Sequence, residues 1–412
     1  MNKRILLIAT GDTHALFDLS GACVLETIDA EIVAAIEPGA AKKLGDRSGV
    51  SVLPTHFGDL SRNEPLLDQL HAVHEAAPFD GVVTIDERCV ELAASVRSKL
   101  GIPGVQPELA LRFRDKVEMK RIVQAAGLRV PHYTGGESQA DALALLRQHG
   151  RLVVKPRSGY GSRGVHFVSN PDELAAAWTQ AQVEGDFEAE EYIDGVLYHT
   201  NSIVLDGEVL FTAVAPYIPG MGNIDYARGT PFVTASLTEG VLLDRLREFS
   251  RQVIEALGIE RAVTHMEVFV TPGEEIVFCE VAIRPGGGGI VQMIEAQYGI
   301  HIARAAIQLE CGADKTRLLA GLHSRPGVMG LVGMRSIATG FVRQVPSAAE
   351  FVQDWIRQKL INVQTGQFLA PSAHCTDFTG RFVIECDDHA DFARKTESLQ
   401  QQFDAALMVA PL

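Results

Sequence analysis

The sequence predicts a multi-domain protein that combines an α/β domain with α+β domains, and three observations support this fold class. The chain has 412 residues, which at about 150 residues per domain gives two to three domains. Its hydrophobic fraction is 46% and its charged fraction is 22%, both ordinary for a chain with buried cores. Apolar strand-like runs alternate with helical patterns over the first hundred residues, which indicates a doubly wound parallel sheet.

The composition and charge exclude several classes of protein. The balance of apolar and charged residues rules out a disordered chain, a collagen-like fibre and a coiled coil. The 37 Lys and Arg against 52 Asp and Glu give a net charge of −15, so nucleic acid and anionic membranes are not the expected partners. No apolar run reaches about 18 residues, and the apolar stretch at the N-terminus is too short for a signal peptide. The six cysteines form no CxxC pair, so we expect reduced thiols in a cytoplasmic protein.

The predicted N-terminal sheet places two acids at the end of a strand. Residues 4–9, 30–36 and 81–85 are the expected strands, and a helix follows to residue 100. Ligands of such sheets bind at the carboxyl ends of the strands, which here points to Asp86 and Glu87. A compatible interpretation makes Asp86 a helix N-cap and Glu87 a favourable acid in the first turn.

The rest of the chain is expected to form α+β units. The predicted elements are a helix at 114–127, strands at 152–155, 165–168 and 187–193, and a strand-rich region from 201 that ends in a helix at 290–310. The last hundred residues mix strands and helices, such as a strand at 381–386 and a helix at 391–402, and carry no motif that we can interpret.

A predicted hairpin brings two glutamates together. Residues 262–270 and 276–283 alternate around a turn at 272–275. This register sets Glu267 opposite Glu280, Phe269 opposite Phe278 and His265 opposite Ala282. The residues that then point to the other face, toward the core, are Met266, Val268, Val270, Val277, Cys279 and Val281. Carboxylates about 5 Å apart repel by roughly 3 kcal/mol at an effective dielectric near 20. A divalent cation such as Mg²⁺ converts that cost into a binding site, and the alternative is an exposed pair that splays into solvent.

Two glycine-rich segments suit anions. Arg284 precedes Pro285 and the four glycines 286–289, whose backbone N–H groups can approach a phosphate or carboxylate closely. A flexible loop before a helix would explain the glycines but not the arginine. Lys155 ends a strand before the glycine-rich residues 159–164, which either cradle a polyphosphate or form a plain hairpin turn. The GxxxxGK[ST] phosphate loop and the GxGxxG fingerprint are both absent.

Taken in order, these segments resemble the ATP-grasp superfamily of carboxylate–amine ligases. The motif at 115–131 is similar to the family's entry helix, residues 153–164 to its second phosphate lysine and lid, and E-E-Y-I at 190–193 to the hinge that holds adenine. Glu267, Glu280 and Arg284 match the two metal-binding acids and the arginine downstream. The resemblance implies a Rossmann-like domain at 1–112, a lid subdomain at 113–195, an ATP-grasp core at 196–312 and a C-terminal α+β subdomain at 313–412.

The resemblance also implies a role for individual residues. It assigns ATP to Lys116, Lys155, Ser158, Gly161, Ser162, Glu190, Glu191 and Ile193, and Mg²⁺ or Mn²⁺ to Glu267 and Glu280. It assigns the substrates to Glu87, Arg228, Arg284, Gly287 and Gly288, with Arg284 and Lys155 as catalytic groups. The loop at 217–234 that contains Arg228 is equally well explained as a solvated loop. His265 shares the metal face, and the simpler interpretation is an ordinary strand histidine.

The sequence departs from the family pattern at two positions, and one of these departures resembles a particular group of family members. Ala282 stands where many members have an Asn in E-x-N-x-R, and Leu197 stands where they have a ribose-binding acid. Bacterial L-amino acid ligases of the bacilysin and dapdiamide kind share Glu-x-Ala-x-Arg. That resemblance implies a homodimeric enzyme of antibiotic biosynthesis that joins a small carboxylate to the amine of an amino acid through an acylphosphate, releasing ADP and phosphate. A bicarbonate-using carboxylase and a non-catalytic ATP-binding protein are the alternatives.

Overall fold

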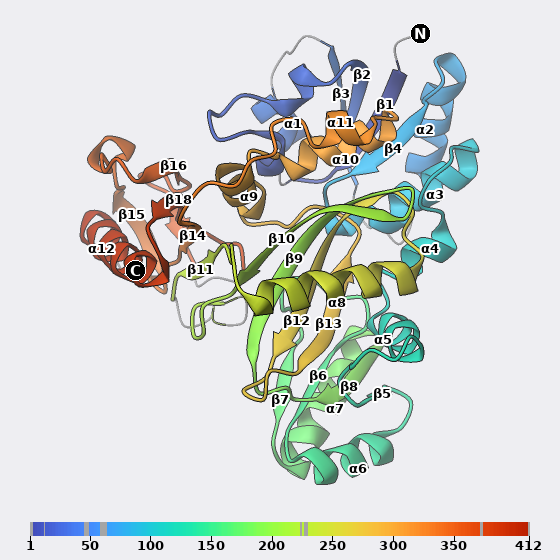
Figure 1. Ribbon diagram of the computed structural model, residues 1–412, viewed down its shortest axis with the longest axis vertical. Coiled ribbons are helices and arrows are strands. Elements are labelled where there is room, and N and C mark those ends of the chain that lie inside the picture. The colour runs from blue at the N-terminus through green and yellow to red at the C-terminus, as the bar shows by residue number, and fades with distance from the viewer. Residues whose placement is uncertain are drawn as a thin grey trace.

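The computed structural model describes residues 3–11, 13–44, 49–57, 64–222, 225, 230–370 and 374–410. In Figure 1 the N-terminal sheet lies at the top, a small four-stranded sheet at the bottom and a long sheet between them. The C-terminal part of the chain packs on the left of this view. The long middle sheet therefore contacts regions that are far apart in the sequence.

The N-terminal sheet is parallel, with the strand order β3-β2-β1-β4. Its strands are β1 (Lys3–Ala9), β2 (Ala30–Ile36), β3 (Val50–Pro54) and β4 (Gly81–Thr84). The near-continuous apolar runs of β1 and β2 suit strands that are covered on both faces. Helices α1 (Pro38–Leu44), α2 (Glu64–Ala76) and α3 (Val90–Leu100) follow β2, β3 and β4. Because the strand order reverses at β1, the prediction of a doubly wound sheet is confirmed.

The small sheet has the order β5-β8-β6-β7 and is antiparallel. It consists of β5 (Tyr133–Gly135), β6 (Leu152–Pro156), β7 (His166–Val168) and β8 (Phe187–Glu191), and it packs against α6 (Gln139–His149) and α7 (Pro171–Glu184). Two helices precede it, α4 (Pro107–Leu111) and α5 (Lys116–Ala125). The Asp115 carboxylate accepts hydrogen bonds from Val117 N and Glu118 N, which fixes the start of α5.

The long middle sheet has the order β10-β9-β12-β13. Its strands are β9 (Val196–Leu205), β10 (Glu208–Pro216), β12 (Ala262–Val270) and β13 (Ile276–Ala282). The apolar stripe of α8 (Val241–Leu257) packs on one face, in a cluster that includes Leu246, Val253 and Phe278. The opposite face carries apolar residues such as Ile203 and Val263, which join another core cluster, and polar side chains such as His265 and Glu267.

The hairpin β12–β13 follows the predicted register only up to the two glutamates. Glu267 lies opposite Glu280 and His265 opposite Ala282, but the register shifts between Glu267 and Val268. Phe278 is then paired with Val268, so the predicted pairing of Phe269 with Phe278 is wrong. A bulge adds one unpaired residue, which reverses the faces beyond it. Phe278 enters the core and Cys279, which we expected there, lines a cavity.

The helix predicted at 290–310 is two helices, α9 (Ile290–Tyr298) and α10 (Ile302–Glu310). Gly299 ends α9 at a φ of 70°, a left-handed conformation that favours glycine. His301 Nδ1 then accepts a hydrogen bond from Arg304 N and caps α10. The sequence analysis missed this break because the helix-like apolar pattern continues across both helices.

The C-terminal region contains two further sheets. β11 (Phe232–Ala235), β14 (Val328–Met334), β18 (Gly380–Cys386) and β16 (Ile356–Ile361) form one, and β17 (Phe368–Leu369), β15 (Gly340–Gln344) and β19 (Met408–Ala410) form the other. α12 (His389–Ala406) covers the first sheet, and α11 (Lys315–Leu318) follows α10. Within the described ranges no helix is long and apolar enough to cross a membrane. All six cysteines are free thiols, as predicted.

The N-terminal segment at residues 14–23 is held against α9. Gln292 Nε2 donates to His14 O and Phe17 O at 2.9 and 2.8 Å, and Leu19 N donates to Glu295 Oε2 at 3.0 Å. Burial raises the pKa of Glu295 to about 7, although the N–H of Leu19 works against that shift. This carboxyl group is therefore protonated more readily in the folded chain than in the unfolded one.

The raised pKa of Glu295 predicts a pH-dependent gain from Glu295→Gln. The pKa of a glutamate in the unfolded chain is about 4.3. The wild-type free energy of unfolding therefore falls as the pH rises from about 4.3 to about 7. The variant lacks this titration while its amide oxygen still accepts from Leu19 N. We expect a higher melting temperature than wild type at pH 8 and no difference at pH 4, measured by thermal unfolding. A difference that does not depend on pH would contradict the titration of Glu295.

Candidate active site

Two cavities meet at the polar face of the middle sheet. The first, about 590 Å³, is lined by the end of β8 and the residues after it, and we call it the hinge cavity. The second, about 350 Å³, is lined by Arg88, Arg114 and Arg284, and we call it the arginine cavity. Lys116, Glu267 and Glu280 line both. Both volumes lie in the range of small-molecule sites.

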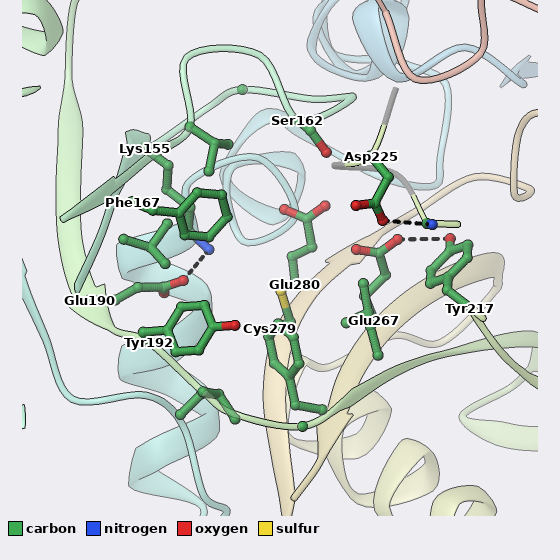
Figure 2. A pocket seen from close by; sticks show the side chains of 18 of the residues that line it. Lys155, Ser162, Phe167, Glu190, Tyr192, Tyr217, Asp225, Glu267, Cys279 and Glu280 are labelled. Carbon is green, nitrogen blue, oxygen red and sulfur yellow. Dashed lines mark hydrogen bonds and ion pairs between the residues drawn. The ribbon is translucent and has the colours of Figure 1, made fainter. Parts of the chain in front are cut away.

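The predicted pair of acids stands at this junction. Figure 2 shows Glu267 and Glu280 side by side, with their carboxylates directed into the hinge cavity. Tyr217 donates a hydrogen bond to Glu267 Oε1 at 2.8 Å, and Lys116 Nζ lies 3.0 Å from Glu280 Oε2. Burial alone would raise the pKa of Glu280, but Lys116 and Lys155 outweigh it and lower that pKa to about 2. Glu280 is therefore ionised throughout the neutral range.

Lys116 connects this acid to the glycine-rich segment. It is the first residue of α5, and its Nζ also donates to Gly159 O at 2.8 Å. The backbone N–H of Lys116 donates to Arg157 O, and the Arg157 guanidinium binds the capping carboxylate of Asp115. The resemblance assigns Lys116 to the ATP phosphates, and this role stays a prediction; in the structure Lys116 lines both cavities beside Glu280.

Two lysines and two glutamates form a buried cluster on the other wall of the hinge cavity. Lys155 Nζ lies 2.5 Å from Glu190 Oε1, as Figure 2 shows, and Lys120 Nζ lies 2.5 Å from both Glu188 Oε1 and Glu190 Oε2. Burial works to raise the pKa of Glu190, but both lysines lower it overall. Sequence analysis assigned no role to Lys120 or Glu188, because they lie on different elements, α5 and β8, and no local pattern shows that they meet.

The remaining walls of the hinge cavity are aromatic and aliphatic. Phe167, Tyr192, Ile193 and Leu197 line it, and the rings of Phe167 and Tyr192 lie edge to face with centroids 5.9 Å apart. Such walls suit a flat heterocycle. The predicted hinge residues Glu190, Glu191 and Ile193 all border this cavity.

A second grouping of possible metal ligands lies behind the hinge. Among the described residues, His132, His149 and Glu191 are the one set of three such side chains within 4.8 Å of one another. Arg129 Nη2 already donates to the Glu191 carboxylate at 2.8 Å. We assign no metal to this group.

In the arginine cavity Glu87 binds two guanidinium groups. Arg284 Nε donates to Glu87 Oε2 at 2.6 Å, and Arg114 Nη1 donates to Glu87 Oε1. Sequence analysis assigned Glu87 to a substrate ammonium group, whereas its two oxygens here hold arginines from distant segments. Asp86 caps the turn after β4 by accepting from Arg88 N at 3.0 Å, so the N-cap interpretation is confirmed.

His265 ends a ladder of buried polar side chains on the same face. Its Nδ1 lies 2.9 Å from Asn201 Oδ1, Asn201 Nδ2 lies 2.9 Å from His199 Nδ1, and His199 Nε2 lies 2.8 Å from Thr234 Oγ1. Thr234 Oγ1 donates to Pro216 O, so His199 donates through Nε2 and Asn201 donates to its Nδ1. His265 consequently donates through Nδ1, and its Nε2 lies 3.8 Å from Glu267 Oε1.

The two glycine-rich segments, at residues 159–164 and 286–289, line the cavities and pack closely against their surroundings. A Cβ at Gly286 would lie 2.8 Å from Asn201 Oδ1 and 3.0 Å from His265 Nδ1, so this glycine packs directly on the ladder. Gly287 and Gly288 border the arginine cavity, and Gly161 and Ser162 the hinge cavity. Gly161 and Ser162 both have positive φ, of 64° and 59°.

One predicted site residue borders neither cavity, and another lies outside the described residues. Ser158, predicted to bind ATP, borders neither, and its carbonyl accepts a hydrogen bond from Arg114 Nη2 at 2.8 Å. Arg228 lies outside the described residues.

Sequence analysis found no role for the C-terminal region, yet it supplies one wall of the arginine cavity. His374, Cys375, Thr376 and Asp377 border that cavity. They precede β18, and no motif in the sequence marks them. Only the packing of the C-terminal sheet against the middle of the chain brings them there.

Comparison with known proteins agrees with this geometry. Residues 37–104 match the ATP-grasp N-terminal domain, and residues 121–299 match the ATP-grasp domain. The chain carries an ATP-grasp domain. The ATP-grasp fold predicted from the order of the motifs is thereby confirmed, and the acid pair, Lys155 and the hinge all lie within that domain.

The relatives of this ATP-grasp chain include amino acid ligases. It is 25% identical to an L-arginine-specific L-amino acid ligase from Bacillus subtilis, over 62% of this chain and 64% of the relative. It is 23% identical to an alanine–anticapsin ligase from Bacillus amyloliquefaciens, over 63% of this chain and 60% of the relative. The matches thus span less than two thirds of each relative's length. The crystal structure of an L-amino acid ligase from Bacillus licheniformis matches the fold with a TM-score of 0.77 at 20% identity, covering 100% of this chain and 99% of that one.

The residues of the ATP-grasp site fit a nucleotide and a hard cation. Glu267 and Glu280 are oxygen ligands of the kind that Mg²⁺ and Mn²⁺ prefer, and they face each other across one ladder. The adjoining cavity is lined by the aromatic side chains of Phe167 and Tyr192 and by Lys116 and Lys155, which suits a purine and its phosphates.

The buried cluster of two lysines and two glutamates beside the hinge cavity predicts a large cost for Lys120→Met. Glu188 and Glu190 would keep only Lys155 as a cation, and an uncompensated buried charge costs about 3–5 kcal/mol. We expect a loss of that size in the free energy of unfolding, measured by urea denaturation. The matched control is Lys99→Met, whose partner Asp68 is exposed, and we expect a loss below about 1 kcal/mol there. Equal losses in the two variants would contradict the role of the buried cluster.

Proposed function

We propose that this ATP-grasp protein is an ATP-dependent ligase that joins a carboxylate to the amine of an amino acid and releases ADP and phosphate. One observation carries the proposal: the hinge cavity and the arginine cavity share the pair of acids and Lys116. A nucleotide in the first cavity would place its terminal phosphate at this junction. A carboxylate in the second would then lie within reach of that phosphate.

The side chains of the junction suit phosphoryl transfer to a carboxylate. Such a transfer depends on positioning and on charge stabilisation more than on a protein nucleophile. When bound between Glu267 and Glu280, Mg²⁺ supplies positive charge to the phosphates. Lys116 and Lys155 offset the remaining negative charge, and Lys155 is kept protonated because its neighbouring acids, Glu190 first, outweigh the effect of burial and raise its pKa.

Arg284 is set to bind the carboxylate that is activated. Its Nε donates to Glu87 and its Nη1 donates to Pro285 O at 2.7 Å, which leaves the two Nη2 hydrogens for a substrate oxygen. The backbone N–H groups of Gly287 and Gly288 lie along the same cavity. We assign to these groups the acylphosphate and the oxyanion that forms when the amine attacks.

The lid formed by residues 159–164 would keep water from the acylphosphate. Gly161 and Arg163 line both cavities, so this segment covers the junction rather than one end of it. Exclusion of water limits hydrolysis of a reactive intermediate. The two relatives reported above from the sequence comparison are amino acid ligases. This favours an enzyme that uses an amino acid as its amine substrate over a carboxylase that uses bicarbonate.

The test is phosphate release over a matrix of paired amino acids and small acids, with products identified by mass. We expect ADP and phosphate to appear only when a carboxylate and an amine are both present. Release of AMP and pyrophosphate would contradict the acylphosphate route. ATP hydrolysis that depends on bicarbonate alone would favour a carboxylase instead.

Replacement of one acid should stop turnover without unfolding the chain. In Glu280→Gln the neutral amide loses both the cation and Lys116 as a partner, and we expect kcat to fall by at least about a thousandfold, as for loss of a major charge-stabilising group. The matched control is Glu239→Gln at an exposed position, with wild-type turnover expected. Both should keep the wild-type circular dichroism spectrum. An active Glu280→Gln enzyme would remove this residue from the metal site.

A further inference from the structure

We propose that His374, from the C-terminal region, binds the ligase reactants by donating a hydrogen bond from Nε2 to one of their anionic oxygens. The inference rests on the proposed function, because it takes the ligase reactants as the occupants of the arginine cavity. It assigns to the last hundred residues a direct part in substrate binding.

The turn that carries His374 is rigid. His374 N donates to Asp377 Oδ2 at 2.8 Å, and Asp377 N donates back to His374 O at 3.1 Å. The buried Arg335 donates through Nη2 to Cys375 O, and its guanidinium lies 5.7 Å from the rings of Phe232 and Phe378. These contacts come from β11, from the end of β14 and from the turn itself. The position of His374 is therefore set before any reactant binds.

The same turn fixes which ring nitrogen carries the proton. Thr376 N can only donate, and it donates to His374 Nδ1 at 3.2 Å. The Thr376 hydroxyl lies 2.9 Å from the same nitrogen. Nδ1 is thus the acceptor and Nε2 carries the hydrogen. Burial, reinforced by Arg163, lowers the pKa of His374, so this neutral form prevails at neutral pH.

The Nε2–H group is buried at the lid without an acceptor among the described residues. A Cβ at Gly161 would lie 2.1 Å from Nε2, so the nitrogen packs directly against the Cα of this glycine. A buried donor without a partner costs about 1–3 kcal/mol. That cost disappears when an oxygen reaches the donor, and His374 borders the cavity in which the reactant oxygens would lie.

The surroundings favour a negatively charged oxygen. Arg163 lies on the lid beside Tyr160, whose ring is 6.0 Å from that of His374, and Arg88 faces the same cavity. Two reactants present such an oxygen, the carboxylate of an amino acid and the phosphoryl group in transfer. Both are bound by an N–H donor next to guanidinium groups.

Two variants separate the hydrogen bond from the packing of the ring. His374→Phe keeps a flat ring against Gly161 and Tyr160 but has no donor, whereas the amide of His374→Gln restores an N–H at a similar reach. His389→Gln, at the exposed start of α12, is the control. KM is measured separately for ATP and for each amino acid, with kcat and the dissociation constant for ADP.

We expect His374→Phe to raise one KM by about 10- to 100-fold, the range of a lost hydrogen bond to a charged group, and His374→Gln to recover most of it. A rise in an amino acid KM identifies the carboxylate as the partner, and a rise in the ATP KM or a fall in kcat identifies the phosphoryl group. Wild-type constants in His374→Phe, or equal defects in both variants, would overturn the inference. The wild-type enzyme tests the proposed function by itself, since absence of amino acid-dependent phosphate release there would refute that function whatever the variants do.

Discussion

The site depends on two carboxylates held face to face on neighbouring strands. At an effective dielectric near 20, charges about 5 Å apart repel by roughly 3 kcal/mol, and the fold offsets this cost with groups from outside the sheet. Lys116 comes from α5 and Tyr217 from the end of β10. Glu280 can therefore stay ionised in the folded chain before any cation arrives. The position of α5, and with it the capping of its first turn by Asp115, follows from the need to bring Lys116 to Glu280.

The middle sheet also carries the ladder of buried polar side chains, which is stable only because its members hydrogen-bond to one another. His199, Asn201 and Thr234 are fully buried, and each additional unpaired group there would cost as much as a hydrogen bond can contribute. The ladder closes at Pro216 O at one end, and at the other end it brings His265 Nε2 beside Glu267. Gly286 must be a glycine because it packs on the Asn201–His265 hydrogen bond, so the ladder also fixes where the glycine run begins.

Local sequence patterns predicted the parts of the fold and the site that depend on residues close together in the sequence. The alternation of residues 262–283 placed Glu267 opposite Glu280, but no propensity announced the bulge that turned Phe278 into the core and Cys279 into the cavity. Gly299 was visible, yet the apolar pattern on both sides of it looked continuous. Lys120 and Glu188 lie 68 residues apart, and the turn at His374 reaches the lid only through the C-terminal sheets. Contacts of this kind are set by tertiary packing, which a single sequence does not display.

The charges of the site balance one another through pairs that a reactant can replace. Lys116 neutralises Glu280, and Glu87 pairs with both Arg284 and Arg114, the second of which also lies 3.5 Å from Glu91. A cation that binds the acids would release Lys116 toward a phosphate, and an anion that binds Arg284 would take up donors that Glu87 leaves unused. Each internal pair holds its side chain in the orientation that the reactant needs, so little reorganisation accompanies binding. An arrangement with free charges would lose that advantage, because the arginines would repel each other and the acids would move apart.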